Sequence, residues 1–388
     1  MHSKSNKNLV IALYSHPDYY PPTLNAIESL SRKYNNIFIV HRNINGLEWD
    51  YPSNVQLITY GKSINVRIAE RVGLLKKIIW YLSFTLTLFK VLKKNKGCVF
   101  LVYDYMPLLA YRLISKLVQK PIALWYHNHD VADPELISKY SISWFAWKSE
   151  NWIFPKLDIF SLPSLDRKKY FPINKLKGNF YYLPNFPSQI VFKKFYNYNK
   201  EKEITDKIKI LFHGSIGSMH GLEEIIEILH TEIQGKKIEL VLKGFISSEY
   251  KEKLKGIAIQ NNVENQLIFI EPSGLKGVIE NTQNCHIGIG IYRKDDIMNN
   301  TVGTASNKIY EYAAAGMPVL LFDNEYFKTI LKDKEWAFFT DTSKKSLLES
   351  IKSIVVDYSL LSSYAINDFN DKLCFEYHFN NALNAILK

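Results

Sequence analysis

The sequence predicts an α/β protein of two domains, each a doubly wound, Rossmann-like parallel sheet with right-handed crossovers. Its 388 residues exceed one ordinary core, because domains usually hold about 100–200 residues. Short apolar runs alternate with helical patterns along both halves, as in chains built from βα units. The two halves also open alike, with a polar stretch, a β-rich run, a turn and a helical pattern.

The opening units contain the clearest strands. Leu9–Tyr14 precedes a Pro-rich turn and a helical pattern at Thr23–Tyr34, and Ile208–Phe212 precedes a Gly-containing turn and one at Leu222–Leu229. Each reads as the first strand, loop and helix of a sheet. Further strands are expected at Ile37–Val40, Val55–Tyr60, Cys98–Val102, Ile122–Tyr126, Ile159–Leu162, Ile238–Leu242, Leu267–Ile270, Ile287–Ile291, Val319–Phe322 and Ala337–Phe339.

The domain boundary is expected within residues 192–207, where apolar periodicity lapses and charge accumulates. This gives a first domain over residues 1–200 and a second over residues 201–359.

Composition limits the class of protein. A hydrophobic fraction of 47% with 22% charged residues excludes a disordered chain. The three cysteines form no CxxC pair or Cys/His cluster, so we expect a reducing compartment and no metal site. The net charge of +11 favours a polyanionic partner, either a nucleotide diphosphate or an anionic membrane surface. No nucleic-acid-binding motif is present, which disfavours DNA and RNA.

The N-terminal apolar run is too short for a secretion signal, so we expect a cytoplasmic protein. One segment complicates this expectation. Ile78–Leu92 is strongly apolar, is interrupted by Lys90 and is flanked by Lys76–Lys77 and Lys93–Lys94. It is shorter than the roughly 18–20 apolar residues that span a bilayer. Two interpretations stay open: a core helix, or an interfacial helix at the inner face of a membrane.

The most specific string is SNKIYEYAAAGMPVL, from Ser306 to Leu320. It combines a polar first turn, a short Ala-rich helix and a C-terminal glycine, followed by proline and a strand. Helix N-termini bind phosphate through their amides, which places Ser306, Asn307 and Lys308 at a diphosphate. Glu311, one turn later, is positioned to accept two ribose hydroxyls.

This string resembles the donor-binding signature S-x-K-x-x-E-Y-x-A-x-G-x-P-V of family-four glycosyltransferases, which are retaining enzymes of the GT-B fold. The resemblance implies two Rossmann-like domains facing across a cleft, with a nucleotide-sugar donor on the second. It also implies that segment 360–388 is a C-terminal helix that packs back on the first domain. In this family the residue matching Glu311 holds the ribose.

The loop HGSIGSMHG, after the first strand of the second domain, resembles the family's loop under the donor phosphates. Gly214 and Ser215 would lie closest to the phosphates. The family usually has Arg and Lys where this chain has Ser215 and His220, and Lys243 is the cation expected to substitute. The family's second glutamate is replaced by Gly303. Residues 290–304 would then line the sugar pocket with backbone groups and with Arg293 or Asn300.

In the first half, ALWYHNHDVADPE follows a predicted strand, at the edge where α/β sheets bind ligands. By resemblance His129 is the candidate catalytic residue facing the donor sugar, with His127 as the alternate. Asp104 lies at another strand end, as an ambiguous candidate. The remaining explanation for the two histidines is a structural role in the loop.

The resulting expectation is a hexosyltransferase, of the kind found in bacterial capsule or lipopolysaccharide biosynthesis. It would move a sugar from a nucleotide-sugar, UDP-sugar by default, to a glycan or lipid-linked saccharide, with retention and with neither metal nor cofactor. No D-x-D motif that would anchor a metal is present. Two alternatives stay open: a non-catalytic GT-B-like partner subunit and a nucleotide-sugar 2-epimerase.

Overall fold

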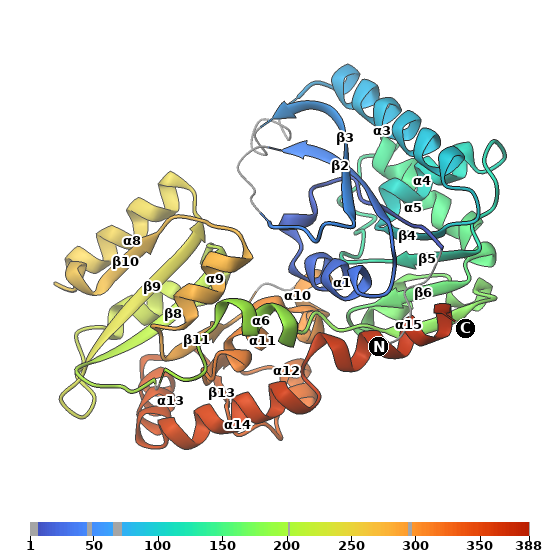
Figure 1. Ribbon diagram of the computed structural model, residues 1–388. Helices are drawn as coiled ribbons and strands as arrows, with labels where there is room; N and C mark the ends of the chain where they lie inside the picture. The colour runs from blue at the N-terminus through green and yellow to red at the C-terminus, as the bar shows by residue number, and fades with distance from the viewer. Residues whose placement is uncertain (1–6, 45–48, 65–71, 201, 294–296, 388) are drawn as a thin grey trace. The chain divides into compact units, whose positions relative to one another are not determined.

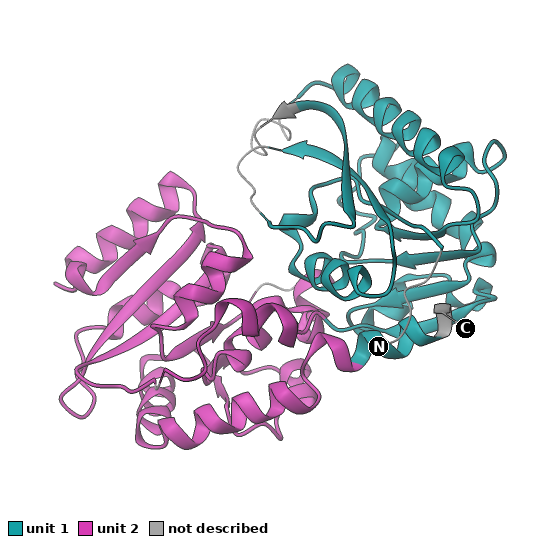
Figure 2. Cartoon of the chain, viewed as in Figure 1, with its two compact units in different colours: residues 1–184, 378–388 teal, residues 185–377 magenta. Residues whose placement is uncertain are grey.

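The computed structural model describes residues 7–44, 49–64, 72–200, 202–293 and 297–387. The chain forms two compact units, coloured separately in Figure 2: unit 1 is residues 1–184 and 378–388, and unit 2 is residues 185–377. Each unit is built on one sheet, and the described strands of each sheet pair in parallel. This confirms the predicted fold class.

Unit 1 contains a seven-stranded sheet in the order β3-β2-β1-β4-β5-β6-β7 (Figure 1). Its strands are β1 Leu9–Ala12, β2 Ile37–Ile44, β3 Val55–Ile64, β4 Val99–Tyr103, β5 Ala123–His127, β6 Ile159–Leu162 and β7 Asn179–Tyr182. Its helices are α1 Pro21–Ser31, α3 Leu74–Lys94, α4 Tyr105–Ile114 and α5 Ile142–Ile153, with 3-10 turns η1 Pro17–Tyr19, η2 Phe154–Lys156, η3 Leu165–Tyr170 and η4 Ile173–Lys175.

Unit 2 contains a six-stranded sheet in the order β10-β9-β8-β11-β12-β13. Its strands are β8 Lys207–Ser215, β9 Lys237–Phe245, β10 Leu267–Ile270, β11 Ile287–Gly290, β12 Val319–Phe322 and β13 Ala337–Thr340. Its helices are α6 Gln189–Phe195, α7 Leu222–Ile228, α8 Ser248–Gln260, α9 Leu275–Thr282, α10 Ile297–Asn300, α11 Asn307–Ala314, α12 Glu325–Leu331, α13 Lys344–Val356 and α14 Tyr358–Asp371, with 3-10 turns η5 Ser218–His220, η6 Glu264–Gln266 and η7 Gly303–Ala305.

Central strands are buried on both faces, as parallel strands between helices must be. All residues of β1, β4 and β11 are buried. Every strand expected from the sequence is present within a few residues. The strand that was not expected is β7, an edge strand whose half-buried NFYY sequence lacks the aliphatic run that marked the others.

The units meet along the chain at 184/185, earlier than the expected boundary. The linker residues that looked irregular in sequence are bound to unit 2. Tyr196 and Tyr198 donate hydroxyl hydrogen bonds to the carbonyls of Ala315 and Ala314, at 2.8 and 3.0 Å. Because tyrosine hydroxyl groups make these contacts, the segment shows no apolar periodicity in the sequence.

The C-terminal segment returns to unit 1 at a later residue than the expected residue 360. It forms α14 and α15 (Phe375–Leu387), and α14 packs against α11 of unit 2. Residues from His378 onward belong to unit 1, where Phe379 stacks on Trp125 with ring centroids 5.6 Å apart. The helix that returns to the first unit is therefore α15 alone.

Two glycines let the ends of β8 and β9 come together. Gly214 and Gly244 are register partners, and both have positive φ, +115° and +142°. A Cβ at Gly244 would lie 1.9 Å from the carbonyl oxygen of Gly214, so no side chain fits without moving the strand end.

Gly244→Ala should therefore lower the free energy of unfolding by about 2 kcal/mol or more, because it adds both a clash and backbone strain. Gly256→Ala is the matched control: it lies within α8 with nothing within 4 Å of the added Cβ. The control should be neutral or stabilise by up to about 1 kcal/mol. Urea denaturation measures both, and equal midpoints for the two variants would contradict the close approach.

Candidate active site

Polar side chains meet at the carboxyl end of β8, beside the first turn of α11. Nε2 of His213 lies 3.3 Å from a carboxylate oxygen of Glu311, and both side chains are buried. The hydroxyl of Tyr312 accepts a hydrogen bond from the His213 amide at 3.1 Å, which fixes the strand end to the helix. Carboxyl ends of parallel strands are where open α/β sheets bind ligands.

Lys308 reaches back from α11 over the same strand end. Its Nζ lies 4.1 Å from the ring centroid of Phe212 and 4.9 Å from that of Tyr292. It also passes 3.8 Å from where a Cβ of Gly214 would be. Burial lowers the pKa of Lys308 to about 7, and Glu311 opposes this shift. The amino group therefore faces bare backbone, where an incoming anion would restore its charge.

Burial shifts the pKa values of Glu311 and His213 in opposite directions. Burial raises the pKa of Glu311 to about 7, against the pull of Lys308. Burial lowers the pKa of His213 to about 3, and the nearby Lys308 and Lys243 lower it further. His213 is thus a neutral neighbour, and it leaves the carboxyl of Glu311 available to accept hydrogen bonds from hydroxyl groups.

Ser306 caps the start of α11. Oγ of Ser306 accepts from the amide of Ile309 and pairs with the hydroxyl of Tyr292, at 3.5 and 3.0 Å. Asn307 is the first helical residue, and its buried Oδ1 has no hydrogen-bond partner among the described residues. An acceptor left without a partner costs free energy that a ligand could recover.

The other expected donor-binding residues lie on the neighbouring strand ends. Ser215 is the exposed last residue of β8 and pairs in register with Phe245. Lys243 is the register partner of His213; it is buried, and its Nζ donates to the carbonyl of Glu271 at 3.2 Å. The structure thus places Gly214, Lys243, Lys308 and Glu311 at or beside the ends of β8 and β9.

His220 supplies no cation to this site. Its Nδ1 donates to the carbonyl oxygen of Ile291 at 2.8 Å, and its ring packs 4.4 Å from Phe212. Burial, and then Lys308, lower the pKa of His220 to about 3, so the ring is neutral near pH 7. Lys308 and Lys243 remain as the described cations nearest to His213.

At Gly303, where the resembled family has a second glutamate, neighbouring side chains occupy the space beside the backbone. A Cβ at Gly303 would lie 2.4 Å from Ile330 and 2.6 Å from the hydroxyl of Tyr326, both on α12. A glutamate at residue 303 would therefore require the ends of both side chains to shift. Glycine at this position leaves room for the contact between η7 and α12.

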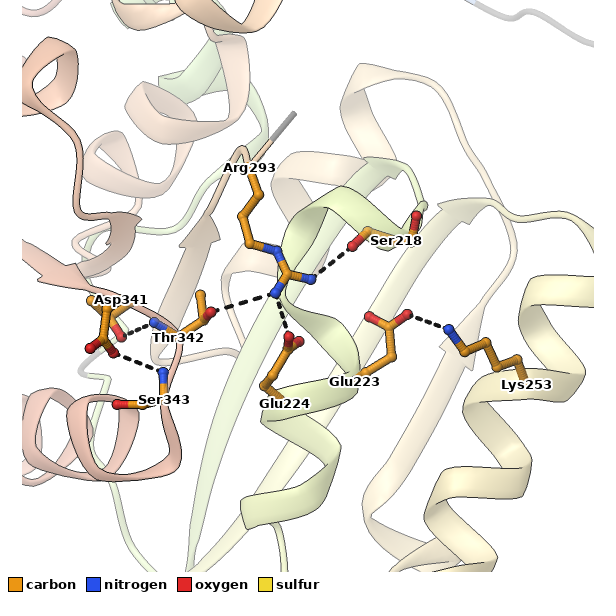
Figure 3. A network of polar contacts seen from close by, with 9 residues as sticks. Ser218, Glu223, Glu224, Lys253, Arg293, Asp341, Thr342 and Ser343 are labelled. Carbon is orange, nitrogen blue, oxygen red and sulfur yellow. Dashed lines mark hydrogen bonds and ion pairs between the residues drawn. The ribbon is translucent and has the colours of Figure 1, made fainter. Parts of the chain in front are cut away.

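Arg293 is held in a polar network (Figure 3). Its guanidinium pairs with Glu224 and donates to the carbonyl of Ser218 at 2.9 Å and to Thr342 at 3.5 Å. These contacts tie three loops of unit 2 together, which assigns Arg293 a structural role. Residues 294–296 of the loop expected to line the sugar pocket lie outside the described residues.

In unit 1, His127 and His129 follow one another at the end of β5. The ring of His129 is buried between those of Tyr20 and Tyr103, stacked at 5.0 and 4.8 Å. Its Nε2 lies 2.9 Å from Oγ1 of Thr23, while its Nδ1 has no hydrogen-bond partner among the described residues. His127 instead pairs with the Ser161 hydroxyl at 2.8 Å, inside the sheet.

Asp104 supports the turn that carries His129. Its carboxylate accepts the amide hydrogen of His129 at 2.7 Å. Its backbone has φ 62° and ψ 172°, a region that is essentially restricted to glycine. Burial and the nearby Asp130 raise the pKa of Asp104 to about 7. This strained residue is held in place by its surroundings.

Two features were missed from the sequence. His213 was read only as part of a glycine-containing loop, although a polar residue ending an apolar strand was a usable signal. Tyr292 was treated as pocket lining, and no local pattern predicts its hydrogen bond to Ser306. Among the described residues no group of three or more His, Cys, Asp or Glu side chains could hold a metal ion.

Comparison with known proteins gives a family match for unit 2. Residues 195–368 match the family model described as glycosyl transferases group 1. This region covers most of unit 2, including β8 and α11. Unit 2 is therefore similar to the group 1 glycosyltransferases, and the match covers less than half of the chain.

Solved structures show the same GT-B fold at low sequence identity. Sucrose-phosphate synthase from Thermosynechococcus elongatus matches with TM-score 0.69 and 11% identity, over 98% of each chain. WaaG, a glycosyltransferase involved in lipopolysaccharide biosynthesis, matches with TM-score 0.60 and 14% identity, over 97% of this chain and 99% of that one. Alr3699/HepE of Anabaena, in complex with UDP and glucose, matches with TM-score 0.63 and 12% identity, over 98% and 99%. No curated protein sequence matches the chain significantly.

Proposed function

We propose that the protein transfers a hexose, with retention and without a metal ion, from a UDP-sugar to a glycan or lipid-linked saccharide. The observation that carries the proposal is the strand end where Gly214, Lys308 and Glu311 meet. It offers bare backbone and a cation for a diphosphate, and a buried carboxyl for two ribose hydroxyls.

The charge on the departing diphosphate would be met by the protein alone. Lys308 and Lys243 both lie close enough to His213 to lower its pKa. An anion binding beside Lys308 would raise the pKa of that lysine above its empty-site value near 7, so the bound state would carry the full cation. Amides at the start of α11 would add their dipoles.

UDP is the proposed nucleotide of the donor because HepE was solved with UDP and with UDP-glucose. The lipid-linked acceptor, and a place in capsule or lipopolysaccharide biosynthesis at the cytoplasmic face of a membrane, are proposed from the part of WaaG in lipopolysaccharide biosynthesis and from the resemblance in sequence. In this proposal unit 2 binds the donor, and His129 of unit 1 is the candidate catalytic residue.

Transfer activity tests the proposal directly. In the presence of EDTA, UDP release from a UDP-hexose should depend on an added lipid-linked saccharide, with GDP- and dTDP-hexoses turned over more slowly. An activity lost on chelation and restored by Mg²⁺ would contradict metal-free transfer. Donor binding without any release would favour the partner-subunit alternative. Conversion of the free nucleotide-sugar into its 2-epimer would favour the epimerase.

Glu311→Ala should weaken UDP-hexose binding by about 1.5–3 kcal/mol, since hydrogen bonds to a charged group are lost. Glu311→Gln keeps the volume but removes the charge and should show a smaller loss. Glu249→Ala, on the exposed first turn of α8, is the control and should bind as the wild type does. Calorimetric titration gives the affinities, and unchanged binding in Glu311→Ala would remove the ribose assignment.

His129→Ala should lower kcat by about tenfold or more while leaving the affinity for free UDP nearly unchanged. The reason is that His129 belongs to unit 1, and its buried Nδ1, which has no hydrogen-bond partner in the described part of the chain, would gain one from a sugar hydroxyl. His230→Ala, which changes an exposed histidine, is the control. If thermal stability and UDP affinity fall together with kcat, His129 is a structural residue.

A further inference from the structure

Helix α3 presents an apolar stripe to solvent. Its inward face packs on β1–β3 and α4 and buries Tyr81, Phe84, Leu88 and Val91, among others. A second, outward stripe consists of Leu75, Ile79, Leu82 and Leu86, which are 77%, 62%, 53% and 59% exposed. Their spacing of four, three and four residues places them in one line along the helix.

Lysines surround this stripe and no acidic residue interrupts it. Lys90 and Lys93 continue the same line at spacings of four and three, and Lys76 and Lys77 are exposed beside its first turn. The sequence of α3 contains no Asp or Glu. The helix thus offers aliphatic side chains and positive charge toward the same medium.

A long helix of this composition has few suitable environments. At 1.5 Å per residue its 21 residues extend about 31 Å. No described helix has the length and hydropathy needed to cross a bilayer. In an aqueous medium the four aliphatic side chains would stay hydrated at a cost, whereas lysines around them would hinder packing against a basic partner, including a second copy of this chain.

We propose that the outward stripe of α3 binds the surface of an anionic lipid bilayer, with the helix lying in the plane of the headgroups. The aliphatic stripe enters the boundary between headgroups and acyl chains, and the lysines contact lipid phosphates. The inference goes beyond the proposed transfer reaction and rests on it only for its purpose: it places unit 1 where a lipid-linked acceptor would be found.

The test is co-sedimentation of the full chain with phosphatidylcholine vesicles that contain or lack phosphatidylglycerol. Binding should require phosphatidylglycerol and fall with salt. Replacing Leu75, Ile79, Leu82 and Leu86 together by Gln should abolish it. Replacing Lys76, Lys77, Lys90 and Lys93 together by Gln should lower the partition coefficient by on the order of 1,000-fold, at about 1 kcal/mol per lysine.

The matched control changes the same number of charges elsewhere. Lys276, Lys332, Lys345 and Lys352 are exposed lysines of unit 2, and their joint replacement by Gln should leave vesicle binding nearly intact. An equal loss in this control would overturn the proposal, because net charge alone would then explain binding. The absence of vesicle binding at low salt would also overturn the proposal. The same holds if sedimentation velocity shows self-association that is lost when the aliphatic stripe is changed.

Transfer to a water-soluble acceptor separates this inference from the proposed function. The α3 variants should keep that activity and their thermal stability, since the altered side chains are exposed and lie outside the donor site. Vesicle binding with no transferase activity would support the surface and contradict the reaction. Transfer without vesicle binding would do the reverse.

Discussion

The chemistry of unit 2 depends on one constraint: a parallel sheet that is buried on both faces accepts charged groups chiefly where its strands end. At the end of β8 the carboxyl of Glu311 is 3% exposed and has the neutral ring of His213 beside it. Burying such an acid costs free energy unless a partner is supplied. Lys308 offsets part of that cost, and hydroxyl donors of a ligand would offset more.

The same constraint decides how much could be predicted. Periodicity located the expected strands because buried strands must be apolar, and the polar residues next to them then marked the ligand edge. Glu311 and Lys308 could be singled out from the sequence in this way, since both lie on one short helix. His213 and Tyr312 were not singled out, because their contact joins residues 99 positions apart. Only packing brings them together.

Other differences have equally local causes. Arg293 looked available for a ligand, yet its partners lie in loops that begin near Ser218 and Thr342. The unit boundary fell earlier than expected because linker tyrosines bind backbone carbonyls. For α3, the pattern left burial and interfacial exposure both open. The structure combines them, since one face of the helix is core and another is exposed.

The contact between Gly303 and α12 limits which substitutions residue 303 accepts. Tyr326 and Ile330 occupy the space where any side chain at residue 303 would project. A mutation that introduced an acid there would meet both side chains before it could meet a sugar. Because the nearest atoms are the ends of these two side chains, an acid at residue 303 would require both of them to move. Any substitution at residue 303 therefore also changes how η7 packs on α12.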